Sequence, residues 1–272
     1  MKEIRLPNGD TIYCIDELTA LYVYDEIFVE KEYLKRGIEI NNNDVIVDVG
    51  ANIGLFSLFT LTQASKLSIY AFEPIPQIFE VLEANLKPLE SQIMLFNVGL
   101  GEEEKETEFN YYPKVSGDST AVPFDLERKT DLYVKHYKET ICQELPIARI
   151  VPKFLRNWVV RRGLQNFYSS ESIRCHITPL SKIIEKYTIQ KIDLLKIDAE
   201  NYEKHVIAGI EEHDWPKIQQ IAMEVHQHIP EGENLLMELT EFLERKGFSI
   251  DYGDETRETI LDVHMLYAIK KK

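Results

Sequence analysis

Short continuous apolar runs alternate with amphipathic stretches along most of this chain. Strands buried on both faces of a sheet read as apolar runs, whereas helices repeat apolar positions at spacings of three and four. On that basis we expect strands at residues 45–47, 67–73, 92–98, 191–198 and 218–226, and helices from 55 onward and at 78–86, 180–187, 202–210 and 235–246. This alternation predicts an α/β fold with a mostly parallel central sheet.

The two ends of the chain follow other patterns. Residues 3–13 alternate around Asn8-Gly9, a dipeptide that favours a hairpin turn, and residues 18–35 have helical spacing. At the other end, residues 248–252 and 263–270 predict an antiparallel strand pair. We therefore expect an N-terminal hairpin and leader helix over 1–44, followed by one α/β domain over 45–272.

Residues 121–172 separate two predicted strands and are expected to form an inserted lid, because long insertions between core elements usually carry function. Pro152 predicts a kink or restart of a helix near Val151. Three interpretations stay open for the insertion: a lid helix packed on the core, a docking face for an acidic partner such as a carrier protein, and a membrane-surface helix. They depend on an apolar stripe at helical spacing, formed by Ile147, Ile150, Val151, Phe154, Leu155, Trp158 and Val159.

Charge narrows the classes of partner. The chain of 272 residues is 44% hydrophobic, which suits one large domain, and its net charge of −15 disfavours a nucleic-acid partner. Residues 145–170 reverse this charge, because they contain no acidic residue. Their basic residues are Arg149, Lys153, Arg156, Arg161 and Arg162.

The location of the protein is expected to be cytoplasmic. No apolar run approaches the ~18 residues of a transmembrane helix, and the N-terminus lacks the apolar core of a signal peptide. The chain has three cysteines, Cys14, Cys142 and Cys175. They are widely spaced and are interpreted as reduced thiols. Membrane contact is disfavoured on the same grounds.

The turn after the first predicted strand carries the first ligand signal. Gly50, Asn52 and Gly54 lack the G-x-G-x-x-G spacing of dinucleotide sites, and the carboxylate of Asp48 would repel a pyrophosphate. The ammonium and sulfonium of S-adenosylmethionine suit that carboxylate. An ordinary β–α turn is the alternative.

Later strand ends add further polar side chains. Glu73 ends the second strand of the domain, where a carboxylate can accept both ribose hydroxyls of an adenosine. Asn97 or Val98 is expected beside the adenine ring. Asp198 ends another strand and faces the same crevice.

Three segments, 48–57, 70–74 and 195–200, resemble the signature blocks of the FkbM-type S-adenosylmethionine-dependent methyltransferases. The similarity covers approximately residues 24–270 and is weakest at 113–172. It implies a Rossmann-like class I methyltransferase fold and methylation of a hydroxyl on a natural product or a sugar. The acceptor would be a small molecule or a substrate tethered to a carrier protein.

The resemblance also bears on single residues. Phe28 and Tyr33 are interpreted first as core aromatics and second as residues that close the cofactor mouth. Residues 116–120 resemble the family's serine-rich turn near the site. The family usually has glycine at the position of Asn201, but asparagine tolerates the left-handed conformation well.

Four side chains are expected to converge as the catalytic group, namely Asp198, Glu200, Glu224 and His226. His226 is the favoured general base because its unperturbed pKa lies near neutrality. Alternatively, Asp198, Glu224 and His226 hold a divalent cation, Mg²⁺ or Mn²⁺, that activates the hydroxyl.

Two other functions are open alternatives. A nicotinamide-dependent oxidoreductase is disfavoured by Asp48 and by the glycine spacing. A catalytically silent binding module is disfavoured because Asp48, Glu73 and Asp198 are all present.

Overall fold

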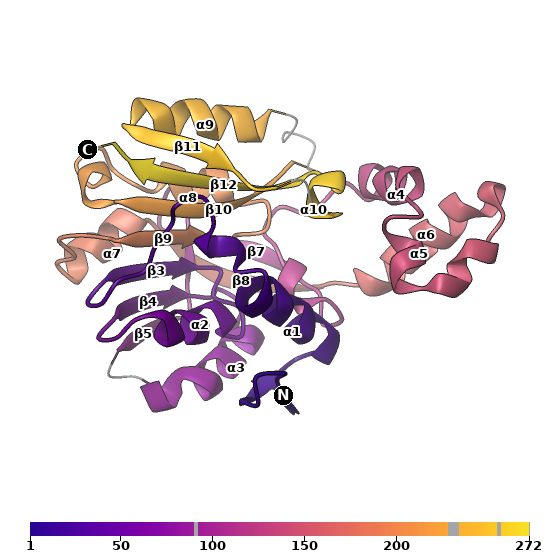
Figure 1. Cartoon of the computed structure of the whole chain (residues 1–272), viewed down its shortest axis with the longest axis horizontal. Coiled ribbons are helices and arrows are strands. Elements are labelled where there is room, and N and C mark those ends of the chain that lie inside the picture. Colours follow the sequence, from indigo (N-terminus) through magenta and orange to yellow (C-terminus); the bar gives the residue numbers. More distant parts are fainter. Residues whose placement is uncertain (90–91, 228–233, 255–256, 272) are drawn as a thin grey trace.

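The computed structural model describes residues 1–89, 92–227, 234–254 and 257–271. At its centre is a seven-stranded sheet with the order β11-β12-β10-β9-β3-β4-β5 (Figure 1). Its strands are β3 (Val45–Val49), β4 (Ser68–Phe72), β5 (Ile93–Phe96), β9 (Leu194–Ile197), β10 (Gln220–His226), β11 (Phe248–Tyr252) and β12 (Val263–Lys270). Only β12 runs antiparallel to its neighbours, so the predicted parallel sheet with an antiparallel C-terminal pair is confirmed.

Helices cover both faces of this sheet, which explains the continuous apolar runs. On one face Ile46 joins a core with α2 (Leu55–Gln63) and α3 (Pro76–Leu86). On the other face Val47 and Val49 join α7 (Leu180–Lys186), α8 (Glu203–Ala208) and α9 (Leu235–Arg245). Since successive strand residues point to opposite faces, a strand in this position is mostly apolar, and Asp48 in β3 and Lys196 in β9 are the buried charged exceptions.

The N-terminal segment forms the predicted hairpin, β1 (Lys2–Arg5) with β2 (Thr11–Cys14). The expected single leader helix is wrong in its length. Helix α1 (Glu17–Tyr24) runs into a π-helical turn at Asp25–Val29, and a separate 3-10 turn follows at Glu32–Leu34. Lys31 has a φ of 51° between the two turns, and this left-handed residue ends the helix.

A second sheet holds the insertion. Strands β6 (Gly99–Leu100), β8 (Glu171–Thr178) and β7 (Lys105–Tyr111) form it in that order. Between β7 and β8 the chain forms α4 (Leu126–Lys135), α5 (Ile141–Glu144), a 3-10 turn (Pro146–Ile150) and α6 (Lys153–Phe167). These helices project from the body as an arm (Figure 1). The predicted break is confirmed, because Pro152 is the N-cap of α6.

The apolar stripe of the insertion does not pack on the core. Phe154 is 82% exposed and Trp158 is 64% exposed. Helix α6 instead buries Val160 and Leu164 in a small cluster with Tyr137, so these residues, and not the stripe, pack it against its neighbours. The expectation of a stripe packed on the body is therefore wrong. Among the described residues, no helix is long and apolar enough to cross a membrane.

Candidate active site

A cavity opens at the carboxyl ends of β3, β4 and β9. This is the edge where α/β sheets bind ligands. Its polar lining comes from the glycine turn, from the ends of β4 and β9, and from Ser116, Gly117 and Ser119. The lining comprises Val49, Gly50, Asn52, Phe72, Glu73, Pro74, Ile78, Gly99, Leu100, Phe109, Ser116, Gly117, Ser119, Asp198, Ala199, Glu200 and Tyr202.

Gly50 allows the two central strand ends to approach each other. Its φ is +71°, and a Cβ at this position would lie 1.7 Å from the carbonyl oxygen of Asp198. Only glycine fits such a contact. The turn after β3 and the turn after β9 therefore form one continuous wall of the cavity.

Glu73 is held in place at the end of β4. Its Oε2 accepts a hydrogen bond from the backbone N–H of Asn52 at 3.1 Å, and its Oε1 accepts one from Ile75 at 2.9 Å. Burial raises the pKa of Glu73 to about 7, although both N–H groups act in the opposite direction. The carboxyl group faces the cavity in a fixed orientation, with lone pairs left for a ligand.

Lys196 is a buried cation beneath the glycine turn. Its Nζ lies 3.4 Å from Oδ1 of Asp48 and 3.3 Å from Oδ2 of Asp198, and it donates to the carbonyl oxygen of Gly50 at 2.8 Å. Burial alone would lower the pKa of Lys196, but Asp198 and Asp48 outweigh it and raise the pKa to about 12. The ammonium thus stays charged and ties three parts of the site together.

Asp48 lies outside the lining of the cavity. Its side chain is fully buried, its Oδ2 accepts from the hydroxyl of Ser57 at 2.8 Å, and Lys196 lies beside its other oxygen. It therefore organises the turn from behind. The carboxyl groups that do face the cavity belong to Glu73, Asp198 and Glu200.

Tyr33 joins the site from the leader segment. Its hydroxyl lies 3.1 Å from Oδ2 of Asp198 and 3.2 Å from Oε2 of Glu224, and it donates to this pair of carboxylates. Burial and the charge of Asp198 raise the pKa of Tyr33 well above its usual value, so the phenol keeps its proton. Phe28 stays in the core and stacks on Tyr24.

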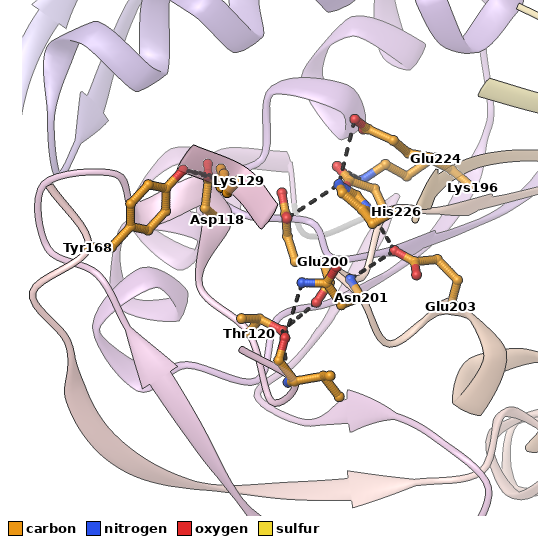
Figure 2. A network of polar contacts seen from close by, with 12 residues as sticks. Asp118, Thr120, Lys129, Tyr168, Lys196, Glu200, Asn201, Glu203, Glu224 and His226 are labelled. Carbon is orange, nitrogen blue, oxygen red and sulfur yellow. Dashed lines mark hydrogen bonds and ion pairs between the residues drawn. The ribbon is translucent and has the colours of Figure 1, made fainter. Parts of the chain in front are cut away.

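His226 is enclosed by glutamates at the end of β10 (Figure 2). Its Nδ1 lies 2.7 Å from Oε1 of the fully buried Glu203. Its Nε2 lies 3.3 Å from Oε2 of Glu200 and 3.8 Å from Oε1 of Glu224. Burial would lower the pKa of His226, but the charges of Glu200 and Glu203 reverse the effect and raise it well above its usual value.

The surrounding carboxylates therefore favour the protonated form of the ring, and the role of His226 as general base stays a prediction. The ring lies behind Glu200 rather than in the lining of the cavity. Burial raises the pKa of Glu200 to about 8, although His226 acts in the opposite direction. Burial and Asp198 also raise the pKa of Glu224 well above its usual value.

The turn that carries Glu200 is unusual in its backbone. Glu200 and Asn201 have φ values of 46° and 72°, so the asparagine does adopt the left-handed conformation. Thr120 donates to the carbonyl oxygen of Glu200, and Asn201 donates to that of Val122 at 3.1 Å. The first residues of the insertion thereby hold the turn in place.

A second polar group lies at the base of the insertion (Figure 2). Lys129 of α4 lies 2.6 Å from the hydroxyl of Tyr168 and 3.4 Å from Oδ2 of Asp118, and Tyr168 donates to Asp118. The ammonium also lies 4.3 Å from the ring centre of Tyr168 and 4.5 Å from that of Phe124. Asp118 lies in sequence between the cavity-lining residues Gly117 and Ser119, so this group fastens the arm beside the cavity.

The structure thus gathers part of the expected set around the cavity. Gly50, Asn52, Glu73, Asp198 and Glu200 line it, whereas Asp48, Gly54, Asn97, Val98, Glu224 and His226 do not. Asn97 instead donates to the main-chain oxygens of Glu73 and Pro74, and Gly54 is the N-cap of α2. Lys196 and Glu203 were not among the expected site residues, and Tyr33 was expected at the cofactor mouth only as a second interpretation. The sequence signal for Lys196 was a lysine inside an apolar strand.

A divalent cation is not supported by the arrangement of side chains. Among the described residues, no group of three or more His, Cys, Asp and Glu side chains has a geometry that can hold a metal ion. The reason is visible at Asp198, where the ammonium of Lys196 and the hydroxyl of Tyr33 already contact the same oxygen. A fixed positive charge stands where the cation was expected.

Residues 48–250 match the sequence profile of a family described as Methyltransferase FkbM domain. The chain is 31% identical to the AMB antimetabolite synthetase AmbE of Pseudomonas aeruginosa, over 98% of its own length but only 12% of that protein. It is 30% identical to the 31-O-demethyl-FK506 methyltransferase FkbM of Streptomyces tacrolimicus, over 98% of this chain and 96% of the relative.

A solved structure shares the fold. It is the methyltransferase FkbM from Methylobacillus flagellatus, with a TM-score of 0.52 and 14% identity over 93% of this chain and 55% of that one. From the profile match and the relatives, the chain belongs to the FkbM family of S-adenosylmethionine-dependent methyltransferases.

Proposed function

We propose that this protein transfers a methyl group from S-adenosylmethionine to a hydroxyl oxygen of a natural-product or sugar acceptor, either free or tethered to a carrier protein. The observation that carries the proposal is Glu200. Its carboxyl group lines the cavity, has a pKa of about 8, and is held from behind by His226. A carboxyl group tuned in this way is a competent general base near neutral pH.

The residues of the cavity fit the cofactor. Glu73 offers free lone pairs at the position of a ribose, and the buried Oδ1 of Asn52 has no hydrogen-bond partner among the described residues. Asp198 places a carboxyl group in the lining, which suits the sulfonium and ammonium of the cofactor. When bound, S-adenosylmethionine supplies an electrophilic methyl group for in-line displacement.

The chain's own residues then handle the proton. Glu200 accepts the proton of the acceptor hydroxyl as the new oxygen–carbon bond forms. The His226 imidazolium orients Glu200 through Nε2, and Glu203 holds the ring through Nδ1. Lys196 and Tyr33 hold the carboxyl group of Asp198 in place at the cavity. Positioning and preorganised charge supply most of the remaining rate.

The choice of acceptor draws on the relatives. One is named as a methyltransferase of 31-O-demethyl-FK506, a name that places the methyl group on an oxygen. Another is an antimetabolite synthetase, of whose length this chain covers only 12%. The first name supports a natural-product hydroxyl as the acceptor, and a tethered acceptor fits a domain within a larger synthetase.

Calorimetry tests the cofactor. We expect S-adenosylmethionine and its demethylated product to bind and NAD⁺ not to bind. Glu73→Ala should weaken cofactor binding by about 1.5–3 kcal/mol, since hydrogen bonds to a charged group are lost. Glu108→Ala, at an exposed position of β7, is the matched control and should change nothing. Binding of NAD⁺ with no response to S-adenosylmethionine would refute the proposal.

A further inference from the structure

The end of the arm carries four large apolar side chains that point into solvent. Ile147 is 74%, Ile150 78%, Phe154 82% and Trp158 64% exposed. They lie on the 3-10 turn before α6 and on its first half, and we name them the apolar tip. A gathering of exposed apolar residues on this scale marks a surface that contacts something else.

The arm's own packing does not need these side chains. Tyr137, Cys142, Ala148, Val160 and Leu164 form the small core of the arm, to which α6 contributes other side chains than those of the tip. The guanidinium of Arg156 lies 4.4 Å from the ring centre of Tyr137 and closes this core. The tip is therefore exposed on a helix that is already packed through other side chains, in the arm that projects from the body (Figure 1).

The charge around the tip is opposite to that of the rest of the chain. Arg149, Lys153 and Arg162 are exposed next to the apolar residues, and no acidic residue occurs between 145 and 170. The whole chain carries −15. An anionic surface would attract the tip and repel most of the remaining molecule, so contact would occur tip first.

We propose that the apolar tip docks on the surface of a membrane that contains anionic lipids. Apolar and aromatic residues flanked by basic ones are the composition of helices that lie in a membrane interface, where tryptophan is also favoured. The tip protrudes, and fluid lipid can surround protruding side chains, whereas a protein partner would need a groove of matching shape. This inference goes beyond the proposed reaction and stands whichever acceptor is methylated.

Vesicle flotation provides the test. The full chain should float with vesicles of phosphatidylcholine mixed with phosphatidylglycerol, and much less with phosphatidylcholine alone. High salt should weaken this binding, because the charge contribution is screened. Trp158 supplies an internal probe, since the other tryptophan, Trp215, is buried in the core. Its fluorescence should shift to shorter wavelength when anionic vesicles are added.

Substitutions separate the apolar from the charged contribution. Phe154→Ser with Trp158→Ser should reduce the partition by at least about tenfold, because two large side chains no longer enter the interface. Leu18→Ser on α1 is the matched control, since Leu18 is 80% exposed but lies outside the arm. Arg149→Gln and Lys153→Gln should each cost about fivefold. Arg174→Gln, at an exposed position of β8, should cost nothing.

Two outcomes would overturn the proposal. If the folded chain floats with neither kind of vesicle, the membrane proposal is wrong and the tip is instead a docking surface for a protein. A chain that forms dimers in solution, and becomes monomeric through Phe154→Ser with Trp158→Ser, would show that a second copy covers the tip. Methyl transfer and cofactor binding are measured separately, so failure of the membrane proposal is distinguishable from failure of the proposed reaction.

Discussion

The cavity and the apolar tip use side chains in opposite ways. Around the cavity, charged groups such as Lys196, Glu203 and His226 are buried, whereas at the tip apolar groups such as Phe154 are in water. Both arrangements cost free energy of folding, since buried charges lose hydration and exposed apolar groups order water. Neither arrangement is explained by the needs of the fold.

The difference lies in where the compensation comes from. Buried charges near the cavity face opposite charges within the chain, as Lys196 faces Asp48 and His226 faces Glu203, or backbone N–H groups, as Glu73 does. The tip residues face outward from a helix whose packing is complete without them. The charges around the cavity are thus held in place by contacts within the protein. The apolar side chains of the tip would be removed from water only by contact with another surface.

The largest expected effect is on the proton acceptor at the cavity. Glu200→Gln keeps the shape and removes the basic oxygen, so we expect kcat to fall by ~10²–10⁴, the usual range for loss of a general base. Cofactor affinity measured by calorimetry should change little by comparison. Glu108→Gln, an exposed carboxylate on β7, serves as the control. A variant that retains full activity would remove Glu200 from the mechanism.

The same residue sets the pH dependence. A general base works only when it is deprotonated, and the pKa of Glu200 is about 8. The value of kcat/KM should therefore rise with pH through this region and level off above it. Glu200→Gln should abolish that rise. A profile that falls over the same interval would indicate that a protonated group is required instead.

A smaller effect is expected one step further from the cavity. Glu203→Gln leaves His226 without one of its negative partners, and groups that orient a catalytic residue typically contribute about tenfold to a hundredfold in activity. The pKa of His226, followed by its ring signals in NMR, should fall in this variant. A merely structural role would change the melting temperature and leave this pKa unmoved.

The smallest effect is expected at the tip. Phe154→Ser with Trp158→Ser removes apolar surface that is not buried in the folded chain, so the free energy of unfolding should stay within about 0.5 kcal/mol of the original. Val160→Ala, in the small core of the arm, should by contrast cost more than about 1 kcal/mol. Chemical denaturation of each variant measures both. A strongly destabilised tip variant would mean that the tip packs within the chain.

The elements of the fold could be read from the sequence wherever one local pattern decided the outcome. The apolar runs of β3 and β9 predicted strands that are buried on both faces, and helices cover both faces of the sheet in the structure. The turn at Asn8-Gly9 and the left-handed Asn201 follow from local backbone preferences. The single leader helix fails at Lys31, because its left-handed backbone is not encoded in the apolar spacing.

Tertiary structure alone decided which side chains meet at the strand ends. The sequence marks Asp48 as a carboxylate near a glycine turn, but only the packing of β9 against β3 turns it toward Lys196 and away from the cavity. Tyr33 reaches Asp198 across 165 residues of chain. The charge state of His226 likewise depends on three glutamates that no spacing brings together.

The same division holds for the arm. Periodicity in the sequence determined that α6 has an apolar stripe, and charge counting determined that the stripe is surrounded by basic residues. Neither could determine what the stripe faces, because a helix can pack through any side for which a neighbour exists. In the tertiary structure Val160 and Leu164 pack in the cluster with Tyr137, whereas Phe154 and Trp158 are exposed to solvent.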